Sequence, residues 1–131
     1  MTKEMWADVF AHQLKGIMFH ADAYGISLLH SYRKLAKAHC HHAKMEMNNF
    51  MSARCKSIEQ LGEIIDIPAV KRIDVPHNAT EKELAEMWLA WESEAAEMYA
   101  KAVAAEPSCK WWAELHRDVS DEIKYITKMF F

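Results

Sequence analysis

The stretch from Leu28 to Leu61 contains neither glycine nor proline, and its apolar residues recur with the 3.6-residue period of an α-helix. The residues that share this face are Leu28, Tyr32, Leu35, Ala43, Phe50 and Ala53. A helix of this length extends about 50 Å at 1.5 Å per residue. The whole chain has three glycines and three prolines, few for a sheet protein with many turns, so we predict an all-α fold.

Periodicity and end signals predict four helices, over residues 3–24, 28–61, 80–105 and 109–129. Gly25 is expected to separate the first two, with Ser27 as an N-cap, and Thr80–Glu83 has the form of a capping box. In an alternative division the first helix continues straight through Gly25 and breaks near residues 40–42. Pro68 could begin a short helical turn over residues 69–73 within a long connection. Residues 1–131 are therefore predicted to form one domain, a four-helix bundle with a long crossover between its second and third helices.

Charge and hydropathy restrict the function classes and the location. The formal net charge of −3 gives no indication of a nucleic-acid surface. No apolar run approaches the roughly 20 residues of a membrane span, and the N-terminus lacks the apolar core of a signal peptide. Three widely spaced cysteines indicate free thiols in a reducing compartment, so we expect a cytoplasmic protein.

Three polar residues interrupt the apolar face of the second helix: His39, His42 and Glu46, at relative spacings of 0, 3 and 7. Imidazoles and a carboxylate in a core are costly unless they are paired, hydrogen-bonded or bound to a metal. His42 and Glu46 lie one turn apart, so both could reach one ion. This face is therefore the first candidate for function.

The other helices also direct polar groups inward. The first offers Gln13 and His20, and the fourth offers Glu122 with Asp118 one turn earlier. The third offers Glu94 on one flank and Glu92 on the other, with Ala95 at the centre. Imidazole and carboxylate ligands from facing helices are how bundles build iron, manganese or zinc sites. We predict a metal site with His42, Glu46, Glu94 and Glu122 as ligands and with His39 and His20 as further ligands or hydrogen-bonding neighbours. Tyr24, Gln13, Asp118 and His30 are expected near it. The sequence has no nucleophile elbow or phosphate loop, so no catalytic residue is assigned.

Two segments carry a family resemblance: Phe19–Gly25 followed by Leu28-Leu29-His30, and Ser57–Gly62. They resemble the ferritin-like superfamily, and the Dps-type mini-ferritins most closely. His20 and His30 match the family's two histidines in order and approximate spacing. The chain departs from the pattern at Ala21, where the family has an aromatic residue, and at Lys34, where it has an acidic one. The resemblance implies iron binding, often with Fe(II) oxidation and storage, in a hollow oligomer.

The leading hypothesis is thus a ferritin-like metal-binding bundle for iron, with manganese or zinc as alternatives and Fe(II) oxidation as its candidate activity. One alternative is a non-catalytic helical scaffold or interaction protein that binds no metal. Another is a zinc-dependent hydrolase with a three-histidine site formed by His20, His39 and His42. The adjacent Trp111 and Trp112, with Phe131 at the end of the chain, indicate contacts in a homo-oligomer.

Overall fold

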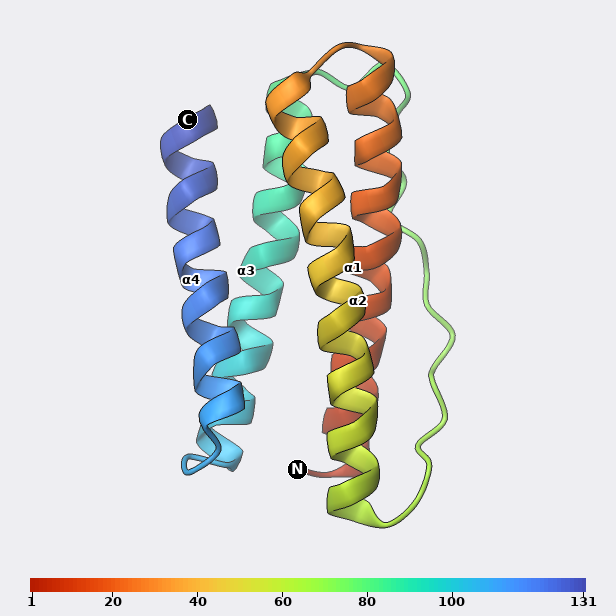
Figure 1. Ribbon diagram of the computed structural model, residues 1–131, viewed down its shortest axis with the longest axis vertical. Coiled ribbons are helices and arrows are strands. Elements are labelled where there is room, and N and C mark those ends of the chain that lie inside the picture. Colours follow the sequence, from red (N-terminus) through yellow and green to blue (C-terminus); the bar gives the residue numbers. More distant parts are fainter. The chain divides into compact units, whose positions relative to one another are not determined.

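Four long helices make up most of the chain, and the computed structural model describes all 131 residues (Figure 1). The helices are α1 (Lys3–Leu29), α2 (Arg33–Leu61), α3 (Glu81–Ala105) and α4 (Lys110–Phe130), and there is no strand. The prediction of an all-α chain with four helices and one long connection is confirmed. The chain forms two compact units, Thr2–Ala79 and Thr80–Phe131, of which the second also includes Met1. Each unit contains one pair of helices.

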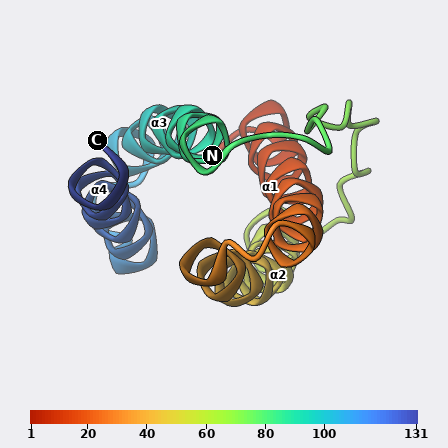
Figure 2. The ribbon, with the colours of Figure 1, turned by 90° about the horizontal axis from the view of Figure 1, so that it is seen from above.

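The N-terminal hairpin pairs α1 with α2 in antiparallel orientation around an aromatic core (Figures 1 and 2). Thr2 caps α1 because its hydroxyl oxygen accepts a hydrogen bond from the backbone N–H of Met5. The ring of Phe10 on α1 meets that of Phe50 on α2 edge to face, with centroids 6.0 Å apart. The Trp6 indole N–H donates to the side-chain oxygen of Gln60 at 2.7 Å, which joins the start of α1 to the end of α2.

The turn between α1 and α2 lies later in the chain than predicted. The helix continues through Gly25 to Leu29, so the predicted ranges 3–24 and 28–61 are corrected to 3–29 and 33–61. A glycine inside a helix costs only about 1 kcal/mol, which the packing of buried residues on either side outweighs. The reversal is instead made at Ser31, whose φ of 61° is left-handed. Ser27 is buried within α1 and is not an N-cap, so that expectation is wrong. The alternative division is right that the first helix continues through Gly25, but wrong that the break falls near residues 40–42, because α2 is unbroken there.

The connection between α2 and α3 is extended and follows α1 (Figure 2). It begins at Gly62, which ends α2 with a left-handed φ of 69°. The predicted helical turn over residues 69–73 does not form, because so short an isolated helix gains little from its own hydrogen bonds. The segment is instead fastened by side chains: the Arg72 guanidinium donates to both carboxylate oxygens of Asp22, and Arg54 donates to the Ile65 carbonyl at 2.5 Å.

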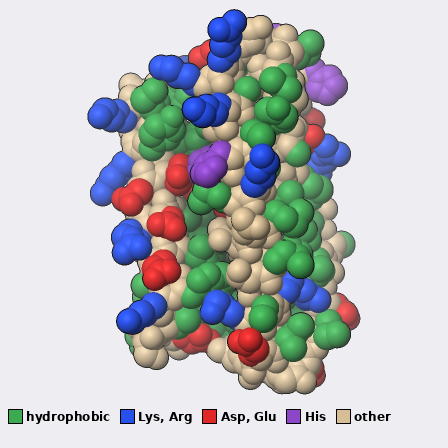
Figure 3. Space-filling model, in the orientation of Figure 1, with side chains coloured by type: hydrophobic (Ala, Val, Ile, Leu, Met, Phe, Trp, Pro, Cys, Tyr) green, Lys and Arg blue, Asp and Glu red, His purple; other side chains and the backbone are tan.

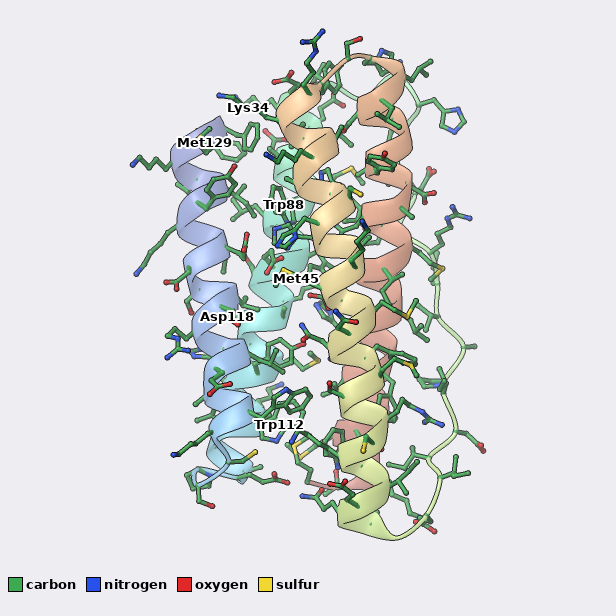
Figure 4. All side chains as sticks on the ribbon, viewed as in Figure 1. Lys34, Met45, Trp88, Trp112, Asp118 and Met129 are labelled. Atoms are coloured by element: carbon green, nitrogen blue, oxygen red, sulfur yellow. The ribbon has the colours of Figure 1, made fainter.

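The C-terminal hairpin pairs α3 with α4. The predicted capping box is present: the Thr80 hydroxyl accepts from the Glu83 N–H, and the Glu83 carboxylate accepts from the Thr80 N–H. The observed helix ends lie within a residue of the predicted ranges 80–105 and 109–129. Trp88 and Trp112 occupy different levels of this hairpin (Figure 4), and the Trp112 ring lies 6.1 Å from that of Tyr99. Trp88, Trp112 and Tyr99 are among the largest fully buried side chains of the chain.

Groups of hydrophobic side chains and scattered charged side chains are both visible in Figure 3. Met47, Met51 and Ile58 on α2 are exposed, as is Leu28, which the sequence analysis placed on the inner face of the second helix. Leu28 is exposed because it lies in the last turn of α1 and not in α2. No helix contains a stretch long and apolar enough to cross a membrane.

Candidate metal site in the N-terminal hairpin

Three histidines meet inside the N-terminal hairpin. His20 projects from α1, and His39 and His42 project from α2. His20 and His39 have no exposed surface, and His42 is 6% exposed. The Nδ1 atoms of His20 and His39 lie 2.8 Å apart. The ring centroid of His20 lies 5.1 Å from that of His39 and 5.6 Å from that of His42. The structure therefore brings together three of the predicted ligands.

Helix geometry explains this meeting. Residues three apart on a helix lie on one face, so His39 and His42 both face α1. His20 opposes them from the antiparallel helix. Phe19 forms an apolar wall, with its ring centroid 5.3 Å from that of His20 and 5.6 Å from that of His39, which it meets edge to face. The imidazoles are thus held between two helices, away from bulk water.

Burial keeps the inner imidazoles neutral. Loss of solvation, reinforced by the nearby His42, lowers the pKa of His39 from 6.5 to about 3. Loss of solvation is also the main cause that lowers the pKa of His20 well below its ordinary value, followed by the charges of His39 and His42. Two neutral imidazoles share one hydrogen bond only if one Nδ1 donates and the other accepts, so the two rings are opposite tautomers. Neutral imidazole is also the form that binds metals.

Glu46 continues the polar row along α2. It lies one helical turn after His42, is 8% exposed, and presents its carboxylate on the same face. Among the residues predicted near the site, Gln13 is fully buried on α1 and Tyr24 is half-buried. His30 is not part of the cluster: it lies ten residues beyond His20, about 15 Å along the helix axis, and its Nε2 bonds to the His77 carbonyl.

The carboxylates predicted on the third and fourth helices belong to the C-terminal hairpin. Glu94 and Asp118 are exposed, and Glu122 is half-buried (Asp118 is labelled in Figure 4). The buried carboxylate of α3 is instead Glu92, which is 2% exposed and accepts a hydrogen bond from the Trp88 indole N–H at 3.2 Å.

Of the two carboxylates on opposite flanks of this helix, the predicted ligand Glu94 is exposed, and the buried one is Glu92. The signal that could have identified Glu92 is its position four residues after a core tryptophan, which puts both side chains on one face. That Glu94 and Glu122 act as ligands together with His42 and Glu46 remains a prediction.

Within either hairpin, no three His, Cys, Asp or Glu side chains already stand as a metal-binding group. In the histidine cluster the Nδ1 atoms of His20 and His39 lie 2.8 Å apart, which is closer than the roughly 3.3 Å that separates two nitrogen ligands of one tetrahedral ion.

Comparison with protein-family models and with curated proteins finds no match for this chain. The resemblance to the mini-ferritins therefore remains a prediction, carried by two short segments of the sequence.

Proposed function

We propose that this protein binds a divalent transition metal, with iron as the first candidate, at His20, His39 and His42. The observation that carries the proposal is the meeting of three buried imidazoles, two of them joined through their Nδ1 atoms at 2.8 Å. Buried groups of this kind are costly to a fold, and metal coordination is one of the few interactions that offsets the cost.

The distance between the two Nδ1 atoms is close to what a shared ion needs. With metal–nitrogen bonds of about 2.0–2.1 Å and a tetrahedral angle, two ligand nitrogens lie about 3.3 Å apart. His20 and His39 would have to separate by about 0.5 Å from the observed 2.8 Å. The ring that donates through Nδ1 would move its proton to Nε2, so both rings remain neutral and no proton is released. A small side-chain motion therefore converts the hydrogen-bonded pair into two ligands.

The imidazole and carboxylate groups at this site support iron as the bound metal, with zinc as the alternative. Imidazole suits iron, zinc and copper, and the carboxylate of Glu46 would add an oxygen to a nitrogen-rich set. Fe(II) bound with open positions can be approached by dioxygen, so Fe(II) oxidation is the first activity to test. Three histidines with an open fourth position are also the ligand set of some catalytic zinc sites, which supports the zinc-hydrolase alternative.

The same hydrogen bond supports a second candidate function, a scaffold that binds no metal. In that case the bond between His20 and His39 serves to hold α1 against α2 and to fix their register. The two candidates differ in one measurable property, since only the first gains stability when metal is added.

The test is thermal unfolding of the metal-free protein with and without Fe(II) under anaerobic conditions, repeated with Mn(II) and Zn(II). An ion at about 100 times its dissociation constant stabilises the native state by about 2.7 kcal/mol, which raises Tm by about 10 °C in a domain of this size. His39→Gln and His42→Gln are expected to abolish this gain. His77→Ala, which changes an exposed histidine on the connection of the same hairpin, is the matched control and should retain it. Absence of a gain with every metal, or an equal gain in the His39 and His42 variants, would contradict metal binding and favour the scaffold.

A further inference from the structure

A row of four imidazoles leads from the surface of the N-terminal hairpin to its interior. The ring of exposed His41 lies 5.4 Å from that of His42, which lies 5.6 Å from His20, which in turn lies 5.1 Å from His39. Exposure falls along the row, since the last two rings have no exposed surface. His41 is therefore the solvent end of a continuous series of imidazole rings.

These spacings are those of imidazoles that can share an ion. A ring nitrogen lies about 1.1 Å from its centroid, so two imidazoles on one tetrahedral ion at about 2.0–2.1 Å have centroids about 5.2 Å apart. The three observed separations, 5.4, 5.6 and 5.1 Å, are all close to this value. Neighbouring rings of the row are thus spaced so that they can hold the same ion once ring rotation turns one nitrogen of each toward it.

The solvent end of the row opens into a hollow of about 390 Å³. His41 and the half-buried Cys40 line this hollow together, and Tyr24 of α1 forms part of its wall. An imidazole beside a thiol presents nitrogen and sulfur to an arriving ion, which favours transition metals over Mg(II) or Ca(II). Lys37 and Lys44 also line the hollow, so its charge does not attract cations. Capture there must depend on direct coordination.

We propose that His41 is the receiving ligand through which a transition-metal ion reaches the buried histidines, passing to His42 and then to the pair of His20 and His39. The proposal rests on the metal-binding function proposed above. His41 is not required in the final site, so it affects the rate of metal binding and not the equilibrium affinity.

The experiment follows uptake of Co(II) by the metal-free protein, using the visible absorption of the bound ion in a stopped-flow instrument. His41→Ala is expected to slow uptake by about tenfold, equivalent to about 1.4 kcal/mol in the barrier, while the equilibrium affinity stays close to that of the wild type. The control variant His77→Ala, which changes an exposed histidine of the same hairpin outside the row, should take up Co(II) at the wild-type rate.

The two lysines provide an independent readout. Because they repel a divalent cation, uptake by the wild type should become faster as ionic strength rises from about 0.01 to 0.15 M, where the Debye length falls from about 30 to 8 Å. Replacing Lys37 and Lys44 by Gln should give fast uptake at low salt and remove most of this dependence. Uptake that is insensitive to both salt and these replacements would place the route elsewhere.

Failure of this inference differs from failure of the proposed function. If the wild type binds no Co(II) or Fe(II) at equilibrium, the metal-binding function itself is wrong. If the wild type binds and His41→Ala is as fast as His77→Ala, the access route is wrong. If His41→Ala loses affinity as well as speed, His41 belongs to the final site and the role in transit is overturned.

Discussion

Acidification should destabilise this protein at pH values where its carboxylates are still largely charged. The reason is that the buried histidines His20 and His39 resist protonation in the folded chain. Above pH 6.5 His39 is neutral in both the folded and the unfolded chain and contributes no pH dependence. Below pH 6.5 the unfolded chain binds a proton that the folded chain, with a His39 pKa of about 3, does not. Stability is therefore lost as pH falls from 6.5 toward 3, and is fully present above 6.5.

The size of the effect follows from the pKa of His39. One pKa unit corresponds to about 1.4 kcal/mol, so between pH 7 and pH 5 His39 alone lowers the free energy of unfolding by about 2 kcal/mol. His20, whose pKa is lowered for the same main reason, acts in the same direction. Keeping the range above pH 5 limits the contribution of carboxylates, which titrate mostly below it.

The assay is urea unfolding at pH 7, 6 and 5 in the presence of a metal chelator, followed by tryptophan fluorescence. His39→Gln removes the titrating group, keeps an amide that can bond to His20, and should show a clearly shallower pH dependence than the wild type. His77→Ala, which changes an exposed imidazole, should keep the wild-type dependence. Equal stability of the wild type at pH 7 and pH 5, or an unchanged slope in His39→Gln, would refute the burial of a neutral histidine pair.

Two further predictions concern the backbone and the C-terminal hairpin. Gly25→Ala should raise the free energy of unfolding by about 0.4–1 kcal/mol, since the residue is helical and a Cβ there meets nothing within 4 Å. Gly62→Ala should lower the free energy of unfolding by about 1–2 kcal/mol, because φ at this position is +69°. Thermal unfolding distinguishes them, and equal effects would contradict the assigned conformations. Glu92→Ala removes an acceptor of the Trp88 indole N–H and should lower the free energy of unfolding in urea by about 1–3 kcal/mol. The control Glu97→Ala, at an exposed position of α3, should lower it by less than about 0.5 kcal/mol. Similar values for the two variants would show that Glu92 is not the inward carboxylate of α3.

Local signals predicted most of the helix ends. The capping box at Thr80 and the glycine at position 62 act through the backbone of a few neighbouring residues, so their effect can be inferred without knowledge of the fold. The predicted helix break at Gly25 is wrong because the local cost of a glycine is small compared with the packing of the helix that contains it. The turn at Ser31 carries no strong local signal.

The candidate site was predictable in part. A helical wheel shows that His39, His42 and Glu46 share the buried face of one helix and that His20 lies on the buried face of another. It does not show that His20 lies opposite His39, because that depends on the alignment of two antiparallel helices. Nor does it show that exposed His41 continues the row of rings, since adjacent helical residues point about 100° apart.

The most direct test of the account is the metal content of the protein after anaerobic exposure to Fe(II) and desalting, measured by elemental analysis. The account predicts about one tightly held ion per chain in the wild type and in His77→Ala, and none in the double variant His39→Gln/His42→Gln. Wild-type protein that retains no iron, manganese or zinc would contradict it, as would a double variant that retains as much metal as the wild type.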